Sequence, residues 1–123
     1  MRVPWDLLVS DNRKYVKGYV LSKQYRMAKD GIALLSRQAA HAFGWARTDQ
    51  PVAMTVLVQE PDRRRRDLNF SKALKDGITQ GGAIWEDDRQ VRDERWQFID
   101  TPGKRDPTRA GAILTITRQR GTP

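Results

Sequence analysis

The stretch that decides the fold covers residues 51–72 and reads PVAMTVLVQEPDRRRRDLNFSK. Its first part, residues 52–59, is apolar on nearly both faces of an extended chain, which predicts a central strand. Four consecutive arginines follow and lead directly into Asp67 and a predicted helix over residues 69–79. Consecutive positive charges repel one another, so such a run favours solvent or an anionic partner. The stretch therefore predicts a buried strand, a basic loop and a helix that begins beside an acidic residue.

The flanking sequence supplies the remaining elements of one domain over residues 1–123. A long helix is predicted over residues 22–43, with Ser22 as its N-cap and Gly44 as its stop. Further strands are predicted over residues 2–5, 90–98 and 111–117, and residues 15–21 are read as one extended segment. The predicted fold class is α+β: a small mixed β-sheet with two helices packed on one face, in the order β-α-β-α-β-β. The other face of the sheet needs cover, which a second copy of the chain would supply.

Composition limits the partners and the chemistry. The formal net charge is +8 and the pI is about 10.3, which favours nucleic acid over a membrane surface. No apolar run approaches the roughly 20 residues of a membrane span. The chain has no cysteine and one histidine, His41, so we expect a cytoplasmic protein without a thiolate or multi-histidine metal site. Oxygen ligands, and hence Mg²⁺ or Mn²⁺, are the expected alternative.

Basic residues give the candidate contacts to nucleic acid. Arg63, Arg64, Arg65 and Arg66 precede a predicted helix N-terminus, and the planar guanidinium suits phosphate oxygens, so we predict that they contact phosphate. Asn12 and Lys14 lie in a second basic segment and are weaker candidates for contact with the DNA backbone. Trp85 and Trp96 are interpreted as core or interface residues rather than as platforms for base stacking.

Acidic residues give the candidate catalytic site. Asp67 follows the arginines, and a second acidic cluster, Glu86–Asp88, follows Trp85. Two carboxylates that converge across neighbouring strands could hold Mg²⁺ against a phosphodiester. Both groups of acidic residues also have a simpler structural interpretation. Asp67 could cap the helix, and the Asp87–Asp88 pair could belong to a turn. Lys72, judged on spacing alone, is an exposed helix lysine.

The sequence resembles the RusA family of Holliday junction resolvases, which are common in bacteria and their phages. The resemblance rests on Pro61–Leu68 and Trp85–Val91, with further matches at Val3–Trp5, Ser10–Asn12, Leu21–Ser22 and Tyr25–Arg26. It implies a compact α/β homodimer that binds four-way DNA junctions and nicks two strands symmetrically. It also implies Mg²⁺ or Mn²⁺ held by aspartates, with an essential lysine nearby. By motif, Asp67 and Asp88 are the catalytic and metal-binding acids, and Lys72 is the catalytic lysine.

One departure from the family pattern affects the implied metal site. The family reads Asp-Leu-Asp-Asn, two further residues and then Lys, whereas this chain reads Asp67-Leu68-Asn69-Phe70-Ser71-Lys72. Asn69 either replaces the second aspartate or matches the family asparagine after a deletion, and an acid is missing in both cases. An asparagine oxygen can ligate Mg²⁺ without carrying a full charge. Two hypotheses follow: a metal-dependent endodeoxyribonuclease that resolves junctions in recombination and repair, or a junction-binding protein with weak or lost catalysis. A third reading is a basic protein that binds single strands or RNA.

Overall fold

The computed structural model describes residues 1–10, 15–16, 20–21, 23–61, 69–99 and 110–119. The N-terminal part holds β1 (Arg2–Pro4), the 3₁₀ turn η1 (Trp5–Leu7), β2 (Tyr15–Val16), β3 (Val20–Leu21) and helix α1 (Lys23–Phe43). After it come β4 (Val52–Gln59), helix α2 (Ser71–Gly81), the 3₁₀ turn η3 (Asp88–Gln90), β5 (Val91–Ile99) and β6 (Gly111–Arg118).

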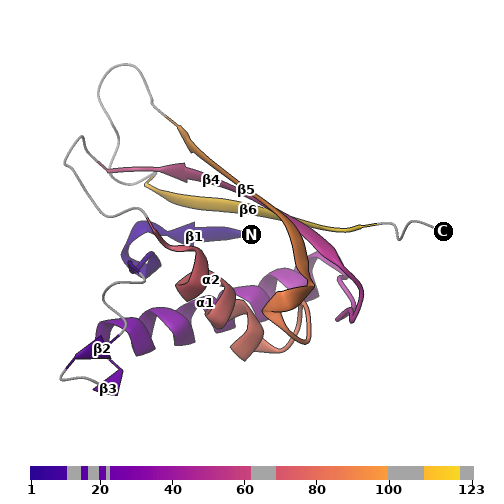
Figure 1. Ribbon diagram of the computed structural model, residues 1–123, viewed down its shortest axis with the longest axis horizontal. Coiled ribbons are helices and arrows are strands. Elements are labelled where there is room, and N and C mark those ends of the chain that lie inside the picture. The colour runs from indigo at the N-terminus through magenta and orange to yellow at the C-terminus, as the bar shows by residue number, and fades with distance from the viewer. Residues whose placement is uncertain (11–14, 17–19, 22, 62–68, 100–109, 120–123) are drawn as a thin grey trace.

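A four-stranded mixed sheet in the order β1-β6-β4-β5 carries both helices on one face (Figure 1). β4 lies between β6, to which it is antiparallel, and β5, to which it is parallel. The predicted central strand and the predicted placement of two helices on one face are therefore confirmed. In the part of the chain that the structure describes, the opposite face carries Ile113, whose exposed fraction is 52%. That a second copy covers this face stays a prediction.

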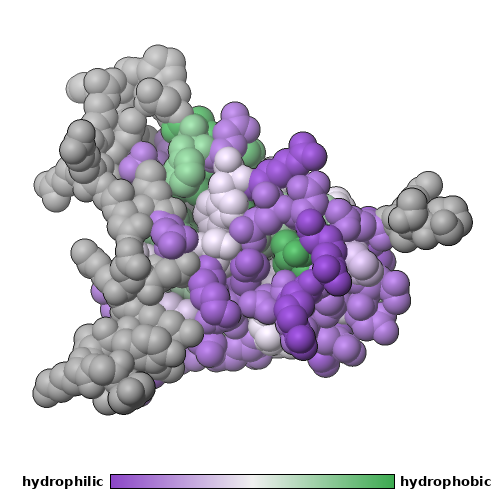
Figure 2. Space-filling model, in the orientation of Figure 1, coloured by the Kyte–Doolittle hydropathy of each residue, from purple (hydrophilic) through white to green (hydrophobic). Residues whose placement is uncertain are grey.

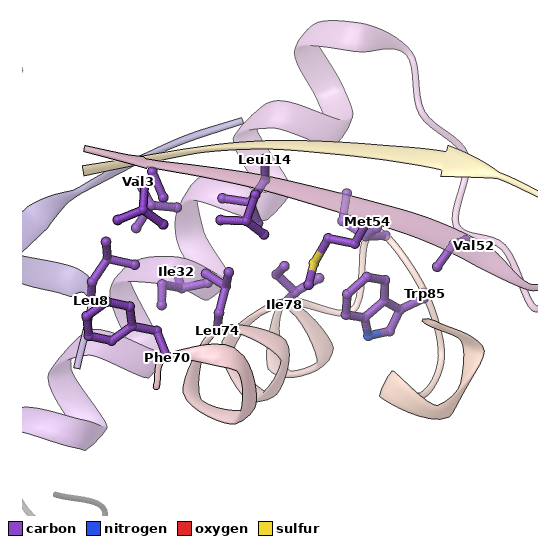
Figure 3. Close-up of a cluster of buried hydrophobic side chains, with 14 of the residues drawn as sticks. Val3, Leu8, Ile32, Val52, Met54, Phe70, Leu74, Ile78, Trp85 and Leu114 are labelled. Carbon is purple, nitrogen blue, oxygen red and sulfur yellow. The ribbon is translucent and has the colours of Figure 1, made fainter. Parts of the chain in front are cut away.

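Burial alternates along β4 and at the start of β6. Along β4, the side chains of Val52, Met54, Val56 and Val58 are at most 1% exposed, while the residues between them are half-buried. Ala112 and Leu114 on β6 face the same core, and Ile113 faces away from it. Figure 3 shows this strand face packed against side chains from both helices. One hydrophobic layer between sheet and helices thus holds the fold together.

The structure corrects the prediction for residues 15–21. We expected one extended segment, but its two ends are separate strands, β2 and β3, which pair antiparallel with Tyr15 opposite Leu21. The chain therefore reverses direction between Val16 and Val20. Gly18 is the sequence signal for such a reversal, because glycine readily enters turns. Residues 17–19, and the predicted N-cap Ser22, lie outside the described residues.

Two glycines of α2 allow this helix to pack closely against α1. A Cβ atom added at Gly77 would lie 2.7 Å from two side-chain atoms of Ile32, and one at Gly81 would lie 2.9 Å from the carbonyl oxygen of Ala33. The absence of side chains at these positions lets the helices approach. α2 starts at Ser71, two residues later than predicted, after the buried Phe70, whose ring packs edge-on against Trp5 at 5.8 Å.

Candidate active site between helix α2 and the turn η3

Lys72 and Asp88 meet in space although they are far apart in the sequence. Lys72 lies in the first turn of α2, and Asp88 begins η3, immediately before β5. The Nζ atom of Lys72 is 3.6 Å from Oδ2 of Asp88 and 3.5 Å from Oδ1 of Asp76, which lies one helical turn further along α2. The Lys72 side chain is 57% exposed and that of Asp88 is 26% exposed. The pair is therefore accessible to a substrate.

The two carboxylates keep Lys72 positively charged. The negative charge of Asp76, and then that of Asp88, raises the pKa of the Lys72 ammonium above its ordinary value. A lysine with a raised pKa stays protonated at neutral pH. A fixed positive charge can neutralise a phosphate oxygen or a departing alkoxide. Figure 2 shows that the described surface over α2 and η3 is mainly hydrophilic.

Asp87 and Asp88 have different environments. Asp87 is the N-cap of η3: its Oδ1 accepts a hydrogen bond from the backbone N–H of Arg89 at 2.9 Å, and its Oδ2 accepts one from the Arg89 guanidinium at 3.1 Å. These contacts lower the pKa of Asp87 from 3.8 to about 2. The contribution of the cap to stability is therefore complete above pH 3.8 and is lost as the pH falls through about 2. Asp87 has a capping role, whereas Asp88 faces the lysine.

Gln90 completes this turn and ties it to the chain before β4. Its Oε1 accepts hydrogen bonds from the backbone N–H groups of Glu86 and Asp87, at 2.8 and 2.9 Å. Its Nε2 donates to the carbonyl oxygens of Thr48 and Gln50, at 2.8 and 3.0 Å. The spacing Asp87-x-x-Gln90 is a capping-box pattern that could have been recognised in the sequence. The turn that presents Asp88 is thus held by specific hydrogen bonds.

Trp85 anchors the same turn in the core. Its side chain is fully buried, and its Nε1 donates to Oγ1 of Thr79 on α2 at 2.7 Å. Figure 3 shows the ring between β4 and the helices, beside Met54. The interpretation of Trp85 as a core residue is confirmed. Trp96 is half-buried on β5.

Asp76 and Tyr25 were not predicted as site residues, although Tyr25 was placed on the apolar stripe of the first predicted helix. The Tyr25 hydroxyl, on α1, donates to Oδ2 of Asp76 at 2.7 Å. The four-residue spacing of Lys72 and Asp76 could have indicated an ion pair on one helix face. Nothing in the sequence indicated the contact between Tyr25 and Asp76, because 51 positions separate them.

A second ion pair lies further along α2. Lys75 Nζ is 3.0 Å from Oε1 of Glu94 on β5, and the Ser71 hydroxyl donates to Oε2 of Glu94 at 2.8 Å. Burial alone would raise the pKa of Glu94, but the hydrogen bonds from Ser71 and Lys75 lower it below its ordinary value. Glu94 therefore stays ionised at neutral pH and holds Lys75 away from the Lys72 pair.

Several predicted site residues lie outside the described residues. They are Asp67, the arginines Arg63, Arg64, Arg65 and Arg66, and the pair Asn12 and Lys14. Asn69 is described; it is exposed and precedes α2 by two positions. Within the described ranges, no three acidic or histidine side chains gather closely enough to hold a metal ion. Asp67, the predicted partner of Asp88 as a metal ligand, lies outside those ranges, so the metal site stays a prediction.

Comparison with known proteins defines the class of the chain as an endodeoxyribonuclease. The family model described as endodeoxyribonuclease RusA matches residues 4–110. The crossover junction endodeoxyribonuclease RusA of Escherichia coli K12 is 37% identical over 120 residues, which cover 94% of this chain and 90% of the relative. The enzymes of the same name from Shigella sonnei and Enterobacteria phage 82 are each 36% identical over equal shares. The chain belongs to the RusA family. No helix among the described residues is long and apolar enough to span a membrane.

Proposed function

We propose that this protein is a crossover junction endodeoxyribonuclease that resolves four-way DNA junctions by paired nicks. The observation that carries the proposal is the contact between Lys72 and Asp88, since a lysine and an acid implied by the family motifs meet at 3.6 Å on an accessible surface. The named activity of relatives that match 94% of the chain supports the substrate class. The net charge of +8 favours the anionic partner that this activity needs.

The proposed chemistry depends on a divalent ion and on three side chains. Mg²⁺ or Mn²⁺, when bound, would supply an activated water and neutralise charge on the phosphate. Asp88 and Asp67 would hold the ion, with Asn69 as a further oxygen donor. Lys72 would place its ammonium against the scissile phosphate or the leaving oxygen. Arg63–Arg66, with Asn12 and Lys14, would bind the DNA backbone.

The proposal includes a homodimer. Two nicks placed symmetrically across a junction need two equivalent sites related by a two-fold axis. One chain offers one Lys72–Asp88 pair within the residues described, so a second copy would supply the second. Sedimentation should give the mass of two chains for the protein alone, and the mass of two chains plus one junction for the complex.

A synthetic four-way junction tests the activity directly. Protein with Mg²⁺ or Mn²⁺ should produce nicks in opposing strands, and excess linear duplex, single strands or RNA should not abolish junction binding. A gel shift without nicks would instead support a binding protein. Equal competition by all nucleic acids would support only non-specific binding through charge.

We also propose that this protein cleaves junctions more slowly than it would with an aspartate at position 69. The basis is Asn69, which leaves the motif one carboxylate short of the family pattern. Asn69→Asp should raise the nicking rate at limiting metal by about 10- to 100-fold, because a unit charge a few ångströms from a divalent ion contributes a few kcal/mol at an effective dielectric near 20. The rate should be measured as a function of Mn²⁺ concentration.

The control for this substitution adds one negative charge elsewhere. Gln97→Glu changes an exposed residue of β5 and should leave the rate within about twofold. If Asn69→Asp cleaves no faster than the wild type at any metal concentration, the idea of an impaired site is wrong.

A further inference from the structure

We propose that Asp76, itself held by the Tyr25 hydroxyl, is a positioning residue that keeps the Lys72 ammonium beside Asp88. The inference rests on the proposed function, because it concerns how the proposed catalytic lysine is placed. Asp76 belongs to neither of the two motifs that carry the family resemblance.

The two oxygens of Asp76 have separate partners on different elements. Oδ2 accepts the hydrogen bond from Tyr25 at 2.7 Å, and Oδ1 lies 3.5 Å from Nζ of Lys72. Tyr25 is 1% exposed, and its ring belongs to a small core cluster with Val9, Ala28 and Ala73. The buried Tyr25 on α1 therefore restrains the orientation of the Asp76 carboxylate. This distinguishes Asp76 from an ordinary surface partner four residues along a helix, which can rotate freely.

Lys72 needs such an anchor because its side chain is long and 57% exposed. A lysine ammonium on a flexible four-carbon stem samples many rotamers unless a partner restrains it. Asp88 is a poor permanent restraint in the proposed reaction, since its carboxylate is also the predicted metal ligand. Asp76 is not among the predicted metal ligands, so it would keep its 3.5 Å contact to Lys72 when Asp88 holds the ion. The remaining α2 lysine, Lys75, is held by Glu94 at 3.0 Å.

The chain offers a matched control for loss of a contact between the helices. Asp30 on α1 accepts a hydrogen bond from Nε2 of Gln80 on α2 at 2.7 Å, at an exposed position. This contact joins the same two helices as the Tyr25–Asp76 hydrogen bond and involves no lysine. Asp30→Asn therefore reports the effect of weakening the helix pair without disturbing Lys72.

The experiment compares Asp76→Asn, Tyr25→Phe and Asp30→Asn in single-turnover nicking of a synthetic junction, with junction affinity measured in parallel. We expect Asp76→Asn to slow nicking by about 10- to 100-fold, the range typical of residues that orient a catalytic group. Tyr25→Phe should slow it less, and Asp30→Asn should stay within about twofold of the wild type. Junction affinity should change by less than about threefold in all three, since none of these side chains is proposed to bind DNA. Asp76→Glu should restore part of the lost rate.

A second readout needs no catalysis. The order of the Lys72 side chain, measured by NMR relaxation at its Cε group in the free protein, should exceed that of the exposed Lys23. Asp76→Asn should lower it to the Lys23 value, and Asp30→Asn should not.

The two readouts separate the inference from the proposed function. If the wild type does not nick junctions but the order of Lys72 still depends on Asp76, the proposed function fails and the positioning contact stands. If Asp76→Asn leaves the Lys72 order unchanged, or if it and Asp30→Asn slow nicking equally, the positioning role is overturned.

Discussion

Asp88→Asn should lower the junction-nicking rate by at least about 100-fold while junction affinity stays within a few-fold of the wild type. Loss of residues that merely orient metal ligands typically costs 10- to 100-fold, so loss of a proposed ligand should cost at least the upper value. The same change removes the charge of the carboxylate that lies 3.6 Å from Lys72. Because the Lys72 side chain is 57% exposed, stability should change by no more than about 1 kcal/mol. Single-turnover nicking at saturating Mn²⁺ gives the rate.

The neighbouring aspartate gives a matched control for this change. Asp87→Asn alters the adjacent carboxylate in the same way, but asparagine is as good an N-cap as aspartate, so the turn should persist. We expect a loss of less than about tenfold. Equal losses for the two variants would mean that the turn as a whole matters and that Asp88 has no special role.

Trp85→Ala should lower the free energy of unfolding by about 3–5 kcal/mol, the usual cost of removing a large buried aromatic side chain. The indole is 0% exposed, and its N–H bonds Thr79 Oγ1 at 2.7 Å, so both packing and a hydrogen bond are lost. Since Asp87 and Asp88 follow in the same segment, nicking should fall as well. Urea unfolding followed by far-UV circular dichroism measures the change.

Phe43 provides the comparison for Trp85. Its side chain is 80% exposed at the end of α1, so Phe43→Ala should change stability by no more than about 0.5 kcal/mol. If Trp85→Ala costs as little as Phe43→Ala, Trp85 does not anchor the site in the core.

Regular periodicity made most of the fold predictable. Residues 52–59 are apolar on nearly both faces, which predicted a central strand. The three- and four-residue spacing of apolar residues over 23–43 predicted a helix with one buried face. The reversal between Val16 and Val20 was missed because two-residue strands leave no periodic pattern. The helix was predicted to begin two residues before the observed start of α2. Phe70 matches the apolar spacing of the helix whether it lies inside the helix or just before it.

The motifs indicated two residues of the candidate site, whereas the tertiary contacts around them were not predicted. The resemblance indicated Lys72 and Asp88, and the structure places their charged groups 3.6 Å apart; their catalytic roles stay predictions. The capping role of Asp87 was missed because Asp87 and Asp88 were read as one acidic cluster, although the spacing from Asp87 to Gln90 is a capping-box pattern. The link from Tyr25 to Asp76 depends on how α1 packs against α2, which no local pattern encodes.

The most direct measurement is a crystal structure of the protein soaked with Mn²⁺, with the ion located by its anomalous scattering. The account predicts one ion bound by carboxylate oxygens of both Asp67 and Asp88, with the Lys72 ammonium nearby. An ion bound elsewhere, or Asp67 and Asp88 too far apart to share one ion, would contradict it.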